Sequence, residues 1–189
     1  MSHDATRFFQ NLKEHLHAYP SKPMDVQGLK LKDAAVLAPL FWRDGEPWAW
    51  LTKRPDTLRK HPGQISFPGG GREPSDLTPL HTALRETREE LGIDPEAVSV
   101  LGALGAMPTV TSFWVTPFVG VVDASVVLTP SQSEIAAVLE APLFRLRAEQ
   151  RDIFGAPRDA FVWGDGREVV WGATHRMLKQ LIEHVEAVR

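Results

Sequence analysis

Three glutamates crowd into five consecutive positions of the segment LRETREELGI, which covers residues 84–93. They are Glu86, Glu89 and Glu90, and the first and last lie one helical turn apart. In a helix such a like-charge pair costs about 0.2–0.5 kcal/mol. Either water solvates these charges, with Arg85 and Glu89 forming an i,i+4 ion pair, or the carboxylates surround a bound cation.

A glycine-rich segment, FPGGGREP, lies shortly before the glutamates at residues 67–74. Consecutive glycines let another group approach the backbone at a distance that side chains would block. Carboxylate oxygens are the hard ligands that Mg²⁺ prefers. A glycine turn leading to an acidic helix edge therefore favours a site for a phosphate-bound divalent cation, with Gly69 and Gly70 at the substrate.

The glutamates need a helix to position them, and the sequence predicts one over residues 79–91. Thr78 can cap it, proline suits its first turn, and Gly92 can end it. One arc about 100° wide would dock on a sheet, and this arc holds Leu80, Ala83, Leu84, Thr87 and Leu91. The carboxylates then form a patch at the edge of the buried stripe.

The stretch GGREPSDLTPLHTALRETREELGI resembles the Nudix box, whose form is G-x5-E-x7-R-E-U-x-E-E-x-G-U with U aliphatic. The second half matches at Arg85, Glu86, Glu89, Glu90, Gly92 and Ile93. The first half departs from the pattern. Counting from Gly70 places Asp76 at the first acidic position, with one extra residue before the arginine, whereas counting back from Arg85 places Leu77 there. Thr87 stands where an aliphatic residue is usual.

The segment just upstream, LTKRPDTLRKHPGQISFPGG at residues 51–70, is similar to a signature of coenzyme A pyrophosphatases, L-L-T-x-R-[S/A]-x3-R-x3-G-x3-F-P-G-G. The matching positions are Leu51, Thr52, Arg54, Arg59, Gly63 and Phe67 through Gly70. The chain is identified on these residues as a member of the Nudix superfamily, coenzyme A pyrophosphatase branch. The resemblance implies hydrolysis of the coenzyme A pyrophosphate to adenosine 3′,5′-bisphosphate and 4′-phosphopantetheine.

The resemblance also implies roles for individual residues. Glu86 and Glu90 would bind Mg²⁺ or Mn²⁺, with Glu89 as a third ligand, and Arg85 would orient Glu89 or a neighbouring carboxylate. The general base stays open between Glu89, Glu90 and Glu134, and Glu134 could instead be an acid in the first turn of a helix.

A basic segment precedes the glycines. Arg54 and Arg59 are expected to contact substrate phosphates, since guanidinium groups bind phosphate in a fork. For Lys60 and His61 phosphate contact and surface charge are equally open. Phe67 is expected to be a packing anchor, and most tryptophans to be core.

The remaining segments predict strands interleaved with helices. An amphipathic helix is expected over 3–18, and a closing helix carries the apolar residues between 177 and 185. Strands are expected at 33–42, 47–54, 97–107, 113–122, part of 124–130, 160–164 and 167–171, with Asp-Gly turns inside the first and last pairs. Residues 133–149 are expected to begin as a loop or helix capped by Ser133. These elements predict an α/β fold, a Nudix-like α/β/α sandwich with a mixed β-sheet in one domain over 1–189, with helix 3–18 packed on it.

Composition limits the partners. The 189 residues carry a net charge of −3, which disfavours nucleic-acid binding. The chain contains no cysteine, which excludes disulfides and thiolate chemistry. No apolar run could span a bilayer and no secretory signal is present, so we expect a cytoplasmic protein without membrane contact. A homodimer stays open. The rival functions are Nudix hydrolysis of ADP-ribose, NADH or dinucleoside polyphosphates, a non-catalytic Nudix-fold nucleotide sensor, and a plain acidic interaction surface.

Overall fold

The computed structural model describes residues 1–24, 28, 30–57 and 62–189. Its helices are α1 (His3–Ala18), α2 (Pro79–Leu91) and α3 (Gly172–Ala187), with two short 3₁₀ turns, η1 (Pro95–Ala97) and η2 (Leu143–Arg145). The strands of the larger sheet are β1 (Lys32–Arg43), β2 (Glu46–Lys53), β3 (Ile65–Ser66), β4 (Gly69–Gly71), β5 (Ser99–Ala103), β6 (Met107–Pro108), β7 (Phe113–Val121) and β8 (Ala137–Pro142). A smaller antiparallel sheet holds β9 (Arg147–Ile153), β10 (Ala156–Trp163) and β11 (Glu168–Trp171).

Strand β1 is the centre of the larger sheet, in the order β3-β2-β1-β7-β5. It runs parallel to β7 and antiparallel to β2. Eight of its residues in succession, 34–41, are buried. A strand that is covered on both faces needs a continuous apolar run instead of an alternating one, which is why this segment was readable from the sequence.

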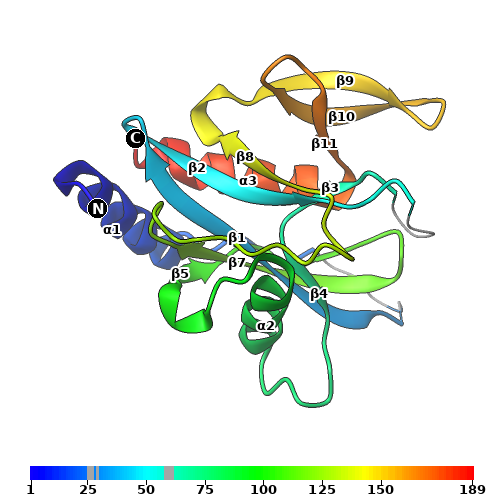
Figure 1. Ribbon diagram of the computed structural model, residues 1–189, viewed down its shortest axis with the longest axis horizontal. Coiled ribbons are helices and arrows are strands. Elements are labelled where there is room, and N and C mark those ends of the chain that lie inside the picture. The colour runs from blue at the N-terminus through cyan, green and yellow to red at the C-terminus, as the bar shows by residue number, and fades with distance from the viewer. Residues whose placement is uncertain (25–27, 29, 58–61) are drawn as a thin grey trace.

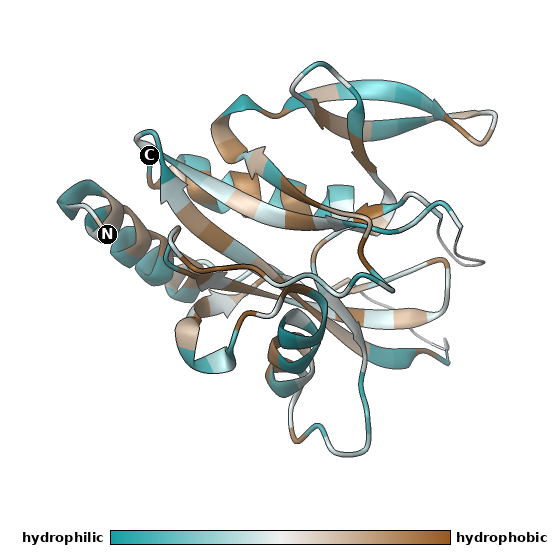
Figure 2. Ribbon diagram, in the orientation of Figure 1, coloured by the Kyte–Doolittle hydropathy of each residue, from teal (hydrophilic) through white to brown (hydrophobic). Residues whose placement is uncertain are grey.

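Helices cover both faces of this sheet (Figure 1). Helix α2 packs on β1 and β4, whereas α1 packs on β5, and α3 packs on α1 and on strands β10 and β11. The hydrophobic residues concentrate in the central strands and on the inward sides of the helices (Figure 2). The predicted α/β/α sandwich with a mixed sheet is therefore confirmed, whereas the boundaries of a single domain over 1–189 stay a prediction.

Several helices and turns begin or end where local sequence signals predict. Asp44 and Gly45 have φ of 53° and 80°, the left-handed values of a tight two-residue hairpin turn between β1 and β2. The Thr78 hydroxyl accepts a hydrogen bond from the His81 N–H at 3.1 Å, and Gly92 ends α2 with φ of 73°. The helix over 3–18 and the hairpin around residues 164–167 are confirmed as well.

Three expectations at loop level are wrong or too coarse. Residues 124–130 form no strand. The segment beginning at Ser133 starts as a turn, in agreement with the loop alternative, but continues as β8 and not as a helix. Strand β8 pairs along nearly all of β2, whose free edge offers a complete ladder of hydrogen bonds and overrides the local helical spacing. The expected strand over 97–107 is divided into β5 and β6.

Candidate active site

The glycine strand β4 is inserted beside β1 where β1 and β2 separate. Residues 40–43 of β1 pair with β2, whereas Ala34–Val36 pair with β4. A Cβ atom on Gly69 would lie 2.4 Å from the carbonyl oxygen of Ala35, which no side chain permits. The absence of side chains thus lets β4 fit between β1 and helix α2.

The same strand brings backbone groups against two glutamates of α2. A Cβ atom on Gly70 would lie 2.5 Å from Oε1 of Glu86. The N–H of Gly69 donates a hydrogen bond of 3.3 Å to Oε2 of Glu90. The β1 backbone therefore restricts Gly69, and the Glu86 carboxylate occupies the place of a side chain at Gly70. The prediction that the glycines and the acidic helix edge meet is consistent with this geometry.

A loop fixes the carboxyl end of α2. The N–H groups of Thr129 and Ser131 donate to the last carbonyls of the helix, those of Leu91 and Glu90, at 2.9 and 3.0 Å. The loop then continues to Ala136, whose N–H donates to the carbonyl of Lys53 at the end of β2. Hydrogen bonds that helix ends leave open are satisfied here by tertiary contacts, which hold the glutamate-bearing turn in place.

The principal partner of Arg85 is Asp76, a pairing that was not among the sequence predictions. Nε and Nη2 of Arg85 donate to the two carboxylate oxygens of Asp76, both at 3.0 Å, in a fork. Asp76 is 2 % exposed and also accepts from the N–H of Glu73 and the hydroxyl of Thr82. The Arg85 guanidinium keeps the pKa of Asp76 well below its usual range, and this aspartate raises the pKa of Arg85.

A signal for this pair was present in the sequence. Counting from Gly70 places Asp76 at the first acidic position of the box, and the one extra residue before Arg85 is accommodated by the loop that leads into α2. The irregular first half of the motif therefore still supplies a carboxylate to the arginine.

Arg85 also contacts the glutamates, so the predicted orienting role has a geometric basis. Its guanidinium donates to Glu86 at 3.0 Å, to Glu89 at 2.9 Å and to the carbonyl of Gly71 at 3.2 Å. The pair with Glu89 is the i,i+4 pair considered above, and the side chain of Glu89 is 55 % exposed.

Glu86 and Glu90 are buried carboxyl groups whose ionised forms the protein stabilises only in part. Burial raises the pKa of Glu90 to about 8, and the neighbouring charge of Glu86 adds to the shift. Burial likewise raises the pKa of Glu86, although Arg85 opposes the change. Because Glu90 is only 4 % exposed, its ionised form calls for a positive partner at neutral pH.

These two carboxylates fit a divalent cation by their chemistry. They are hard oxygen donors on one flank of α2, and the glycine backbone lets the Glu86 carboxylate lie close against it. Within the described ranges, no three acidic or histidine side chains converge closely enough to form a complete ligand set. Glu89, the third predicted ligand, is bound to Arg85, so a metal would require it to turn or to act through water.

The other residues predicted for the site are Arg54, Glu134 and Arg59. Arg54 follows β2, and its charge lowers the pKa of Glu90, so it lies within electrostatic reach of the site. Its Nε is buried without a hydrogen-bond partner among the described residues. Glu134 is exposed, and its charge raises the pKa of both Glu86 and Glu90. Arg59, with Lys60 and His61, lies outside the described residues.

The prediction for Phe67 agrees with its burial, whereas only two of the six tryptophans, Trp50 and Trp163, are fully buried. Phe67 is 2 % exposed and belongs to the main core. Trp50 is buried and stacks on Phe41 with ring centroids 4.2 Å apart. Both are therefore packing residues.

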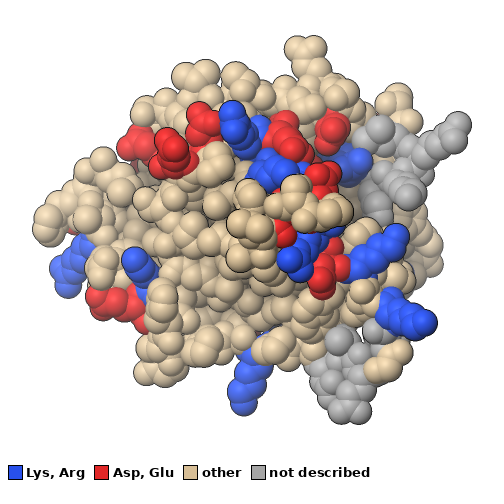
Figure 3. Space-filling model, turned by 90° about the horizontal axis from the view of Figure 1, so that it is seen from below, with Lys and Arg blue, Asp and Glu red and all other residues tan. Residues whose placement is uncertain are grey.

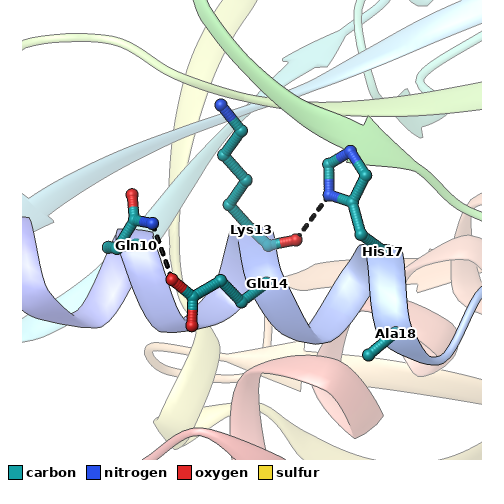
Figure 4. A pocket seen from close by; sticks show the side chains of 5 residues that line it. All are labelled: Gln10, Lys13, Glu14, His17 and Ala18. Carbon is teal, nitrogen blue, oxygen red and sulfur yellow. Dashed lines mark hydrogen bonds between the residues drawn. The ribbon is translucent and has the colours of Figure 1, made fainter.

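The surface around α2 is mixed in charge. In Figure 3, which shows the side on which α2 lies, acidic and basic side chains are intermixed instead of forming one acidic field. A separate shallow hollow on the outer side of α1 has no relation to the glutamates (Figure 4). Its hydrogen bonds are internal to α1, from Gln10 to Glu14 and from the His17 ring to the carbonyl of Lys13.

Comparison with known proteins identifies the family. The NUDIX domain matches residues 31–154, which includes β1, the glycine strand and α2. The chain belongs to the Nudix family. Two similar relatives bear the name uncharacterized Nudix hydrolase NudL. The protein from Enterobacter sp. strain 638 is 40 % identical over 168 residues, covering 86 % of each chain. The protein from Cronobacter sakazakii is 42 % identical over 164 residues, covering 84 % of this chain and 85 % of its own.

Solved structures support the Nudix fold. The NUDIX domain of Shewanella oneidensis NrtR, crystallised with ADP ribose, aligns with a TM-score of 0.53 at 15 % identity and covers 91 % of this chain and 97 % of its own. A MutT/nudix family protein from Enterococcus faecalis aligns with a TM-score of 0.54 at 15 % identity, covering 98 % and 75 %. At these identities the likeness concerns the fold alone.

Family membership supports a hydrolase. Nudix hydrolases generally use divalent metal ions such as Mg²⁺ or Mn²⁺, which agrees with the donor set of this Nudix chain. None of its described helices is both long and apolar enough to cross a membrane. A cytoplasmic location stays a prediction.

Proposed function

We propose that this Nudix hydrolase cleaves the pyrophosphate bond of coenzyme A or its derivatives, giving adenosine 3′,5′-bisphosphate and 4′-phosphopantetheine. The observation that carries the proposal is the contact of Glu86 and Glu90 with the backbone of Gly69 and Gly70. Those glycines end the segment 51–70 that resembles the coenzyme A signature. The last glycines of the coenzyme A-like segment and the two proposed metal ligands therefore lie next to each other.

Glu86 and Glu90 would hold the metal ion, either Mg²⁺ or Mn²⁺, with Glu89 as a third ligand directly or through water. When bound, such an ion neutralises pyrophosphate charge and lowers the pKa of a water molecule. The cation would also compensate the buried negative charge of Glu90, whose pKa of about 8 reflects burial in the metal-free protein.

The chain's own groups supply orientation and phosphate binding. Arg85, fixed by the buried Asp76, holds Glu86 and Glu89 by hydrogen bonds. Arg54 and Arg59 would bind the phosphates of the substrate, since their guanidinium groups match phosphate oxygens.

In the reaction, a water oxygen forms a bond to one phosphorus of the pyrophosphate. The bond from that phosphorus to the bridging oxygen breaks, and the bridging oxygen leaves with the other phosphate. A carboxylate takes the proton of the attacking water. Glu89, Glu90 and Glu134 remain the three candidates for this base, and the charge of Glu134 reaches both Glu86 and Glu90.

The deciding experiment is a product assay with the pure protein and Mg²⁺ or Mn²⁺. Coenzyme A, ADP-ribose, NADH and a dinucleoside tetraphosphate are compared at equal concentration, with products identified by mass spectrometry. We expect the highest kcat/KM with coenzyme A, and no turnover when a chelator removes the metal. Turnover of ADP-ribose with coenzyme A untouched would overturn the coenzyme A assignment and leave the hydrolase intact.

Variants distinguish a hydrolase from the two other hypotheses, a nucleotide sensor and a plain acidic interaction surface. Glu86→Gln and Glu90→Gln should lose activity, whereas Glu96→Gln, an exposed glutamate of η1, should not. A sensor would be stabilised thermally by a nucleotide but give no product with any metal. A plain acidic surface would show no dependence on either glutamate.

A further inference from the structure

Strand β9 forms an open edge of the smaller sheet. The strand order is β11-β10-β9, so β9 has a sheet neighbour on one side only. Among the described residues, no backbone hydrogen bond outside the β10 ladder involves residues 147–153. The strand has seven residues, lacks proline and lies along the upper rim of the molecule in Figure 1. Such an edge can add another strand.

The hairpin turn determines which backbone groups point outward. Phe154 and Gly155 have φ of 56° and 78°, the conformation of a two-residue type I′ turn, and Ile153 pairs directly with Ala156. The residues that flank such a turn share a hydrogen bond, and the pattern alternates from there. The N–H and C=O groups of Ala148, Gln150 and Asp152 therefore face away from β10.

The side chains of the edge carry alternating charge. Glu149 and Arg151 lie on the same face of the strand, with their charged groups 2.8 Å apart and their side chains 34 % and 38 % exposed. Arg147 also approaches Glu149, at 3.4 Å. A strand that meets this edge would therefore be selected by its charges as well as by its backbone.

A second copy of the same strand is complementary in one full-length register. With Gln150 opposite Gln150 of the other copy, Glu149 faces Arg151 twice across the two-fold axis. With Glu149 or Arg151 on the axis, like charges face each other. A register centred on Ala148 would pair Arg147 with Glu149 but would extend past the start of the strand into η2.

We infer that two copies of this chain pair antiparallel through β9, with Gln150 on the two-fold axis, so that the two small sheets form one continuous sheet. The outward groups would form roughly six inter-strand hydrogen bonds. Glu149 and Arg151 would lie opposite each other in the pairs where side chains are closest. A contact limited to a strand edge is small, so we expect dissociation constants on the order of micromolar.

Charge reversal tests the register. Sedimentation equilibrium from about 1 to 500 µM should show a concentration-dependent dimer of the 21.0 kDa chain. Glu149→Arg and Arg151→Glu should each weaken dimerisation by about tenfold or more, because each places like charges opposite one another. An equimolar mixture of these two variants should restore a dimer, and so should the double variant. Lys13→Glu, on the exposed outer side of α1, serves as the control for charge alone.

Disulfide trapping tests which residue lies on the two-fold axis. Because the native chain has no cysteine, an introduced cysteine can pair only with its copy in another chain. Directly opposite residues have Cα atoms about 5.5 Å apart, which a disulfide can bridge. Gln150→Cys should therefore form a covalent dimer under mild oxidation. Asp152→Cys should not, because its two copies would be offset by four residues, about 13 Å. A monomer throughout the concentration range, equal trapping at 150 and 152, or dimerisation indifferent to both charge reversals would overturn the inference.

Discussion

Asp76 and Glu90 are two buried carboxyl groups near helix α2 that differ in how their charge is compensated. Asp76 is buried but receives a fork of two hydrogen bonds from Arg85, and its pKa is lowered. Glu90 is equally buried, accepts one backbone hydrogen bond, and its pKa is raised to about 8. The difference shows that burial alone does not set the charge state, because the available partner decides it. Arg85 keeps Asp76 ionised, whereas Glu90 stays protonated up to about pH 8 unless a further positive partner lowers its pKa.

The largest effect should follow from replacing the two proposed metal ligands, Glu86 and Glu90. If the proposed function is correct, Glu86→Gln or Glu90→Gln should lower kcat/KM by roughly 10²–10⁴-fold, since a metal supplies several kcal/mol to the transition state. Steady-state assays with saturating metal measure the change. An unaltered kcat/KM in both variants would show that hydrolysis does not need Glu86 or Glu90, and would contradict the proposed metal site.

Asp76 should matter mainly for stability. Asp76→Ala leaves Arg85 partly buried without its main partner and should cost about 3–5 kcal/mol of unfolding free energy. Denaturant titration measures it, with Asp33→Ala as the control. Asp33 is 60 % exposed and lies 3.8 Å from Arg72, so its loss should cost about 1 kcal/mol or less.

The pH dependence of the unfolding free energy tests the contribution of Asp76 in a second way. Because the pKa of Asp76 is lower in the folded protein, its contribution is present above about pH 4 and is lost as the pH falls through the folded pKa. Wild-type protein should lose stability at acidic pH more steeply than Asp76→Asn. Parallel acid transitions of the two proteins would contradict the assignment.

A bound cation should stabilise the folded protein through Glu86 and Glu90. Binding at about 100 times Kd contributes roughly 2.7 kcal/mol. Addition of Mn²⁺ or Mg²⁺ should therefore raise Tm in the wild type and in Glu96→Gln, but not in the double variant Glu86→Gln/Glu90→Gln. Equal shifts in all three proteins would place the ion elsewhere.

Without metal, Glu90→Gln should stabilise the protein. The folded protein holds its proton up to about pH 8, whereas the unfolded chain loses it near 4.5, so wild-type stability falls as the pH rises between these values. The variant removes this penalty, with a gain on the order of 1–3 kcal/mol above pH 8 that vanishes toward pH 4.5. Thermal unfolding in chelator at pH 5 and pH 9 measures both limits. A variant less stable than wild type at pH 9 would contradict the prediction.

Much of the active-site region was predictable because its signals are local. The cap at Thr78, the end of α2 at Gly92 and the hairpin at Asp44–Gly45 depend on hydrogen bonds and φ angles within a few residues. The neighbouring positions of Glu86 and Glu90 follow from helix geometry alone. The β8 strand was missed because its partner, β2, is far away in the sequence.

The sequence by itself determined which groups lie one helical turn apart and where the chain turns, since these properties require only short-range geometry. Only the tertiary structure decided that Asp76 neutralises Arg85, that Glu90 is buried against Gly69 and that β9 remains an open edge. Those outcomes depend on which distant segments exclude water from a charged or polar group. That exclusion sets the electrostatic cost and therefore the chemistry of each carboxylate.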